Sequence, residues 1–319
     1  MRALIGLIAA ALAGYFFTTW KMHRDVAAGM DMMVMMMSPY AVVQYEGVSS
    51  TLTGELTVDD IRVRIKGFKD EFFIDRLGID TPSFLSLMKL GDVEGAQSPE
   101  DLIPEEFGII VEGWRLPTDS DLAYWLHKDR LETLGVDTED KAEQCTAKYN
   151  LSPKAAQAMG YENYEMSIAA SFQQMGNRYA VEFEFDAEDM YAIDAEMILV
   201  GDMLTELAKG NRYRPKMSEM RVNYTDLSLN ERMVKYCKLQ GLSEEEIRAA
   251  QVEAFEFFGR DKGIEFDEYV MGPFNEFLDG GRRSLVFTAK PTEPVTLSQI
   301  KLYKPSDVPA LLQLTAEVR

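Results

Sequence analysis

Few residues of this 319-residue sequence have the types and spacing that catalysis requires. It contains two histidines, His23 and His127, so Ser-His-Asp or Cys-His chemistry would have to use His127. The sequence has no GxxxxGK[ST] loop, GxSxG elbow, HExxH helix, CxxC pair or GxGxxG turn after a strand. Because no nucleophile is marked out for His127, we expect a solvated or capping histidine. The sequence therefore predicts no catalytic residue, no metal site, no cofactor and no enzyme activity.

Two groups of residues resemble metal ligands but have simpler explanations. Acidic residues alternate from Glu182 to Glu188, as on the solvated face of a strand, and the sequence has no Asp-x-Asp-x-Asp-Gly calcium loop. Seven of the nineteen methionines lie within residues 22–37. Thioether sulfurs bind Cu(I), but this run lacks ligand-like spacing. We therefore expect these methionines to pack on the following domain.

Composition limits the class of partner. The chain has 33 Lys and Arg residues against 53 Asp and Glu residues, which gives a formal net charge of −20. Nucleic-acid binding needs a cationic surface, so we expect no nucleic-acid partner. Apolar residues make up 46% of the chain, which is enough to form a core.

The N-terminal segment predicts a membrane anchor. Residues Ala3–Trp20 carry no formal charge, and aromatic residues gather at the end of this run, as at a membrane interface. We therefore expect a transmembrane anchor over residues 1–25, a Met-rich stalk over residues 26–39 and one extracytoplasmic domain over residues 40–319. The expected location is the bacterial inner membrane, single-pass, with the domain in the periplasm. Cleavage of a signal peptide at Ala13 is the alternative.

Two cysteines, Cys145 and Cys237, each lie on the apolar side of a predicted helix. An even number of cysteines in an exported domain predicts a disulfide bond between them. In a reducing compartment they would instead be two buried thiols.

Alternating apolar and polar residues predict a largely antiparallel β-sheet. The clearest stretch is a meander over residues 161–200, with turns at Gly176-Asn177 and Glu188-Asp189. Farther toward the N-terminus, the alternation changes parity at Asp59-Asp60, which predicts a β-bulge. Short helices are expected between the strands, so the predicted fold class is α+β.

One face of the meander is the candidate binding surface. Its alternate positions are apolar, and the residues selected as a candidate apolar binding face are Tyr164, Met166, Ile168, Phe172, Val181, Phe183, Phe185, Ile193 and Met197. Capping-box patterns at Ser228-x-x-Glu231 and Ser243-x-x-Glu246 predict helices over residues 228–240 and 243–258. We expect these helices to cover the face as closed core, the alternative being an open groove for a ligand or partner.

The stretch from Tyr45 to Arg64, YEGVSSTLTGELTVDDIRVR, with the preceding anchor and stalk, resembles the start of AsmA-like bacterial envelope proteins and their YdgA-type relatives. The resemblance covers residues 1–90. It implies a β-rich periplasmic protein at the inner membrane whose apolar sheet face accommodates lipid. The expected function is a non-catalytic binding or assembly module for lipid or a membrane-protein partner. An accessory subunit of an inner-membrane complex and an enzyme with an unrecognised site are the alternatives.

Overall fold

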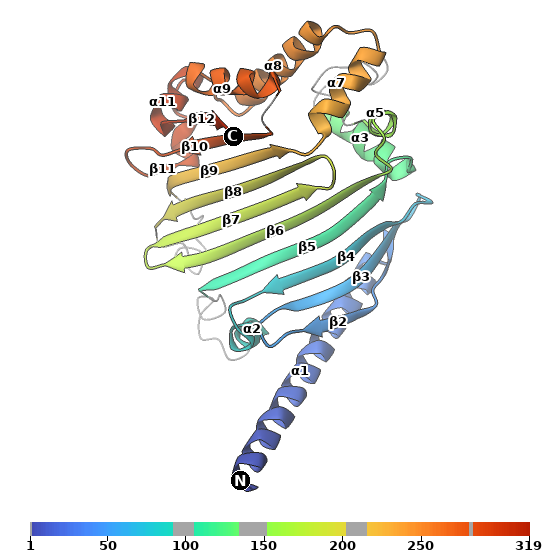
Figure 1. Cartoon of the computed structure of the whole chain (residues 1–319). Helices are drawn as coiled ribbons and strands as arrows, with labels where there is room; N and C mark the ends of the chain where they lie inside the picture. Colours follow the sequence, from blue (N-terminus) through green and yellow to red (C-terminus); the bar gives the residue numbers. More distant parts are fainter. Residues whose placement is uncertain (1, 92–104, 134–151, 202–215, 281–282) are drawn as a thin grey trace. The chain divides into compact units, whose positions relative to one another are not determined.

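The computed structural model describes residues 2–91, 105–133, 152–201, 216–280 and 283–319 (Figure 1). Side chains are described from Phe17 onward within these ranges, apart from residues 89–91, 130–133 and 297–298. Contacts divide the chain into two compact units, Met1–Gly113 and Trp114–Arg319, where the sequence predicts one domain over residues 40–319.

The first unit is a helix packed on antiparallel strands. Helix α1 (Arg2–Met37) is followed by β1 (Ala41–Gln44), β2 (Gly47–Ser50), β3 (Leu56–Ile65), β4 (Phe72–Asp80) and α2 (Phe84–Gly91). The boundary between the units falls within β5 (Glu106–Pro117). Strand β3 pairs antiparallel with β1, β2 and β4. Their apolar side chains form a core with Met30 of α1.

The C-terminal half of α1 is part of this unit. It carries Lys21, Arg24 and Asp25, and Met30 is buried beside Ala41. In the part of the chain whose side chains are described, no helix is long and apolar enough to cross a membrane. The predicted transmembrane anchor, and the single-pass inner-membrane location with a periplasmic domain that was based on it, are therefore wrong.

The methionine run packs less than the sequence predicts. Met30 is buried, but Met32, Met35 and Met36 are exposed on α1. A helix that packs one side on a sheet leaves its other side in water. Only part of the run can therefore contact the strands.

The irregularity at Asp60 is not the predicted β-bulge. Val58 and Ile61 are both buried, so the parity of the inward side chains changes here, and Asp60 has φ 54°. The pairing of β3 with β4 nevertheless keeps one register from Leu56–Ile79 to Val63–Phe72. A bulge would add an unpaired residue and shift this register. The parity change therefore coincides with the left-handed backbone of Asp60 and not with a shift in register.

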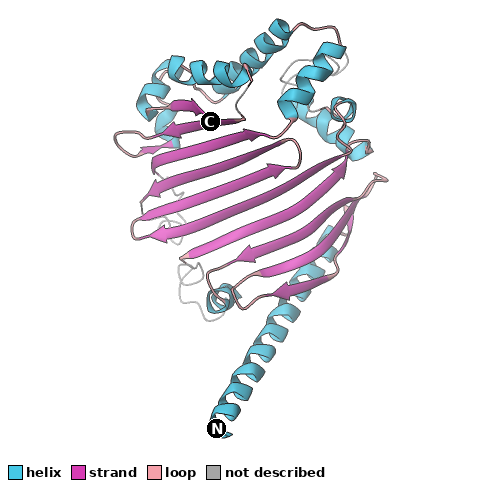
Figure 2. Cartoon of the chain, viewed as in Figure 1, coloured by secondary structure: helices cyan, strands magenta, loops and turns pink. Residues whose placement is uncertain are grey.

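The second unit combines an antiparallel sheet with helices on one side, and it confirms the α+β class and the meander (Figure 2). Its strands pair in the order β6 (Asn163–Met175), β7 (Arg178–Ala187), β8 (Tyr191–Val200), β9 (Lys216–Asp226), β10 (Ser284–Ala289) and β12 (Thr315–Val318), and β11 (Val295–Thr296) pairs with β9. The helical segments are α3 (Asp121–Thr133), α5 (Pro153–Ala158), α7 (Leu229–Leu239), α8 (Glu244–Asp261), α9 (Glu268–Leu278), α10 (Leu297–Ile300), the 3-10 turn η2 (Pro305–Asp307) and α11 (Val308–Leu312).

The two predicted capping boxes have different outcomes. Ser243 and Glu246 form the reciprocal hydrogen bonds of a capping box at the start of α8, as predicted. Ser228 makes no capping bond, because its hydroxyl donates to the carbonyl of Asp189 and contacts the Tyr161 hydroxyl at 3.1 Å. The first turn of α7 is capped instead by Asp226, whose carboxylate accepts from the Asn230 amide at 2.9 Å.

Cys237 is a disulfide-bonded cysteine, and no described cysteine is a free thiol. Cys237 is completely buried in α7 beside Ile247 of α8. Cys145 lies outside the described residues. The cysteine bonded to Cys237 is therefore not described, and packing between α7 and α8 surrounds the Cys237 side chain.

Replacing Gly259 of α8 with alanine should destabilise the second unit. The new Cβ atom would lie 2.6 Å from Phe266 Cε2 and 2.9 Å from the carbonyl oxygen of Ile264. We expect the free energy of unfolding to fall by about 1–3 kcal/mol, as for other overpacked sites. Urea denaturation followed by circular dichroism measures this change.

Gly272→Ala in α9 is the matched control. Its Cβ atom would meet only the Glu268 Oε1 atom, at 3.4 Å. Because alanine favours a helix over glycine by about 0.5–1 kcal/mol, this variant should be as stable as the wild type or more stable. An unchanged unfolding midpoint for Gly259→Ala would contradict the packing described here.

Candidate ligand-binding cavity

The sheet of the second unit has an apolar face formed by residues paired across its strands. Directly paired residues of antiparallel strands lie on the same face. Ile193 pairs with Tyr224, while Val222 pairs with Ala195 on one side and with Phe287 on the other. Strands β8, β9 and β10 therefore present a continuous apolar surface.

Helices α7, α8 and α9 cover this surface and leave a cavity of about 580 Å³ beneath them. Leu229 and Met233 come from α7, Phe255 from α8, and Phe274 and Phe277 from α9. The described residues of the lining are Ile193, Met220, Val222, Tyr224, Leu229, Asn230, Met233, Gln251, Phe255, Phe258, Ile264, Phe266, Phe274, Phe277, Leu278, Leu285, Phe287, Leu312 and Leu314. Its residues lie far apart in sequence and meet only in the folded unit.

Aromatic rings hold the covering segments in place. The Phe255 ring stacks on Phe274 with 4.0 Å between ring centroids and on Phe266 with 4.6 Å, and it lies 5.9 Å from Phe287 on the sheet. Tyr224 and Phe277 make an edge-to-face contact at 5.8 Å. Such aromatic pairs contribute about 0.5–1.5 kcal/mol each beyond the area they bury. One ring of α8 thus connects α8, α9 and the sheet.

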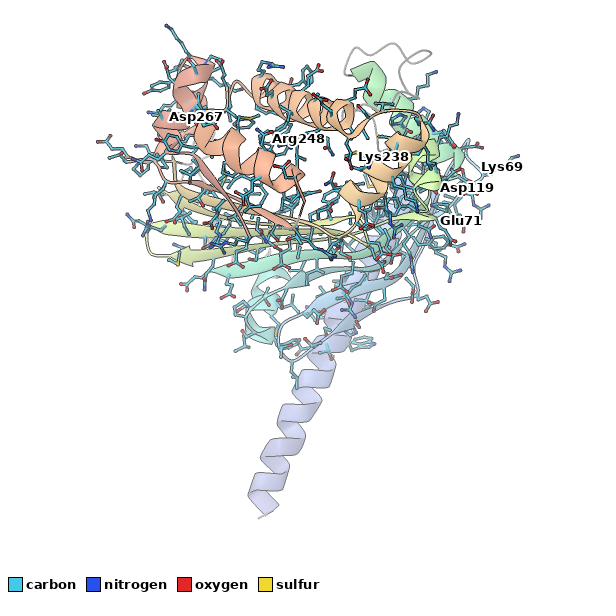
Figure 3. All side chains as sticks on the ribbon, turned by 45° about the horizontal axis from the view of Figure 1, so that its top comes forward. Lys69, Glu71, Asp119, Lys238, Arg248 and Asp267 are labelled. Atoms are coloured by element: carbon cyan, nitrogen blue, oxygen red, sulfur yellow. The ribbon has the colours of Figure 1, made fainter. Side chains whose placement is uncertain are left out.

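Charged side chains fix the helices at their ends (Figure 3). Lys238, near the end of α7, pairs with Glu244 at the start of α8. Arg248 of α8 pairs with Asp279 and donates to the carbonyl oxygen of Asn275 at 3.1 Å, which joins α8 to the end of α9. Asp267 caps α9 by accepting from the Tyr269 amide at 3.0 Å.

Three polar residues of the lining, Tyr224, Asn230 and Gln251, are grouped by their contacts. Gln251 Nε2 donates to Asn230 Oδ1 at 2.7 Å. The backbone N–H of Asn230 donates to the Asp226 carboxylate, and Tyr224 also contacts that carboxyl group. Burial raises the pKa of the Tyr224 hydroxyl, so it stays protonated and can donate a hydrogen bond.

The cavity reaches solvent beside α8. Phe258 lines it, yet 57% of its surface is exposed. Most other large lining residues, including Val222, Phe274 and Phe287, are only partly buried. Their exposed surface in part faces the cavity, so the space between helices and sheet is not filled by side chains.

The residues predicted as the binding face are spread over several environments. Of the nine, Ile193 lines the cavity. Tyr164, Met166 and Phe185 pack against a cluster that includes Ala156 and Met190. The other five residues also lie on strands β6, β7 and β8, but outside both the cavity lining and this cluster.

These other positions are not uniformly covered. Phe172 is buried and stacks on Tyr179 at 5.3 Å, and Val181 pairs with both Phe172 and Met197. Ile168 and Phe183, in the middle of β6 and β7, are 37% and 38% exposed. The described residues therefore leave this part of the face partly open to water.

Sequence reasoning did not select most of the cavity lining. Alternation of Met220, Val222 and Tyr224 indicated a strand, but it did not show that this strand extends the face of the meander. The phenylalanines of residues 255–287 were recognised only as parts of separate helices and a strand. Local sequence patterns do not show that β8 pairs with β9 and β9 with β10, and this pairing is what brings the lining residues together.

The acidic run lies away from the cavity. Glu182, Glu184 and Asp186 are exposed, on the strand positions that alternate with the apolar ones. Among the described residues, no group of His, Cys, Asp and Glu side chains has an arrangement that could hold a metal ion.

A family model described as "Uncharacterized protein" matches residues 154–319. This range contains every described residue that lines the cavity. No curated protein matches the chain. The family match does not include residues 1–90, on which the resemblance to AsmA-like proteins is based, so that resemblance stays a prediction.

Alanine substitution of two phenylalanines should show, by the loss in the free energy of unfolding, which part of the apolar face is covered and which part is open to water. Phe277 is 6% exposed and Phe183 is 38% exposed. We expect Phe277→Ala to lower the free energy of unfolding by about 3–5 kcal/mol and Phe183→Ala by only about 1–2 kcal/mol, since the Phe183 ring already meets water. Chemical denaturation of both variants makes the comparison. Equal losses would show that the face over β6 and β7 is closed core.

Asp226→Asn should change how stability depends on pH. Burial raises the pKa of Asp226 above its ordinary value, although the Asn230 amide and Arg283 lower it in part. The folded protein therefore binds this proton more tightly than the unfolded chain, and ionisation of Asp226 weakens folding as the pH rises through the pKa in the folded state.

The variant keeps an oxygen acceptor for the Asn230 amide but has no charge. We expect Asp226→Asn to be more stable than the wild type at pH 7, with the difference shrinking as the pH falls through the raised pKa. Thermal unfolding of both proteins from pH 4 to pH 8 measures this difference. A difference that stays constant, or grows on acidification, would refute the assignment.

Proposed function

We propose that this chain, which belongs to a family of uncharacterized proteins, is a non-catalytic binding protein that holds an apolar small molecule between the sheet and helices α7–α9 of its second unit. The observation that carries this proposal is the cavity of about 580 Å³ with its largely aromatic and aliphatic lining.

The size and lining of the cavity support a ligand. Small-molecule sites have volumes of about 300–1,000 Å³ and combine apolar walls with a few polar groups. Protein interiors otherwise contain few voids larger than a water molecule. Water in this cavity would find few hydrogen-bond partners among the described residues, whose polar members in the lining are Tyr224, Asn230 and Gln251. An apolar molecule would gain both burial and contacts there.

The arrangement of the covering helices also supports this proposal. Phe258, at the exposed side of the cavity, places an aromatic ring where a ligand would enter. The polar groups lie together rather than around the lining. A site of this kind orients an amphiphile with its polar group at one position and its apolar body along the phenylalanines.

Nile red, an uncharged apolar dye, tests the proposal with the full chain. We expect saturable binding with one dye per chain, seen as increased emission. Val222→Trp places a large side chain on the floor of the cavity and should raise the dye Kd at least about tenfold. Circular dichroism verifies that the variant is folded.

Arg221→Trp is the matched control. Arg221 is the neighbour of Val222 on β9, and it is exposed and outside the cavity lining. This variant carries the same added side chain and should bind the dye as the wild type does. Absence of saturable binding by the wild type, or unchanged binding by folded Val222→Trp, would disprove the proposal.

A further inference from the structure

The charge of the cavity restricts which apolar molecules it can hold. No Asp, Glu, Lys or Arg is among the described residues that line it. The Asp226 carboxylate contacts its polar residues: it accepts from the backbone N–H of Asn230 and contacts Tyr224. An anionic head group placed there would lose its water and lie near the Asp226 carboxylate, and the charge of Arg283 already acts on that carboxylate.

Three cationic side chains of the covering helices have partners away from the cavity. Arg248 pairs with Asp279 and with the Asn275 carbonyl oxygen, and Lys238 pairs with Glu244. Arg232 lies over the Tyr161 ring, 4.4 Å from its centroid. None of these three residues belongs to the described lining of the cavity.

The polar lining can nevertheless bind a neutral head group. The bond from Gln251 to Asn230 uses one donor of the Gln251 amide and the Asn230 carbonyl oxygen. An amide group has two donors and an acceptor oxygen, so Gln251 Oε1 and Asn230 Nδ2 can still accept from and donate to a ligand. Tyr224 adds a hydroxyl group of the lining. These groups match a hydroxyl or an ester carbonyl.

We infer that the ligand is an uncharged lipid with a single hydroxyl or ester head group, held by Asn230 and Gln251 with its chain along the phenylalanines. This inference rests on the proposed function. It names the class of ligand for the same cavity.

Displacement of Nile red by 1-dodecanol, methyl dodecanoate and dodecanoate tests the inference on the wild-type chain. The three molecules share an alkyl chain, and methyl dodecanoate differs from dodecanoate chiefly in charge. At pH 7.5 we expect the alcohol and the ester to have at least about tenfold lower Kd values than dodecanoate. A dodecanoate Kd equal to or lower than that of the ester would overturn the inference while leaving the proposed function intact.

Failure of all three molecules to displace bound dye would overturn the inference, whereas absence of dye binding would refute the proposed function itself.

The variant Gln251→Lys tests where the head group of the ligand lies. A cation at this position should lower the dodecanoate Kd at least about tenfold relative to that of the ester. Gln251→Leu is the uncharged control and should retain the preference for the ester.

An unchanged ratio of dodecanoate to ester Kd values in folded Gln251→Lys would place the head group elsewhere and refute the role of Gln251. If that variant does not fold, the comparison of the three molecules on the wild type still decides the charge of the ligand.

Discussion

The antiparallel register of β8, β9 and β10 is the constraint on which the second unit depends. It places Ala195, Val222 and Phe287 side by side on one face of the sheet, and Glu196 and Arg221 on the other. A slip of one residue would exchange these two sets, because side chains alternate along a strand. The apolar floor of the cavity and the charged surface behind it therefore arise from the same hydrogen-bond pattern.

The helices over this floor are positioned mainly by apolar contacts. The single ring of Phe255 packs on the segment after α8, on α9 and on β10. The ion pairs Lys238–Glu244 and Arg248–Asp279 are largely exposed, and pairs of this kind contribute about 0–1 kcal/mol. They set the spacing of the helix ends, whereas the aromatic rings hold the layer to the sheet.

Sequence patterns predicted the elements of this unit better than their assembly. The meander was predictable because alternation over three strands is a strong local signal. The α8 cap was predictable because the side chains of Ser243 and Glu246, three residues apart, bond to each other's backbone. The absence of a cap at Ser228 was not predictable, because the Ser228 hydroxyl donates instead to the carbonyl oxygen of Asp189, which is distant in sequence. The N-terminal prediction failed because an apolar run was interpreted without the charged half-helix that packs on β1 and β2.

The cavity itself could not be predicted from local patterns. Its lining comes from strands, helices and connecting segments between Ile193 and Leu314, and its volume depends on how their side chains fit together. Alternation shows which side of a strand is apolar, but not whether the opposing helices fill the space above it. Nine apolar positions on the meander were therefore a reasonable prediction of a face, and only Ile193 of them lies in the cavity lining.

The unfilled space under α7–α9 has a consequence for the dynamics of the unit. A helix layer that encloses a cavity makes fewer contacts with the sheet than a solid core would, so it separates at a lower free energy than the strands do. Amide hydrogens of α8 should then exchange with solvent through partial opening, whereas those of β7 and β8 exchange only when the whole unit unfolds. The same opening would let a molecule pass Phe258, which links the exchange of α8 amides to the rate at which the cavity fills.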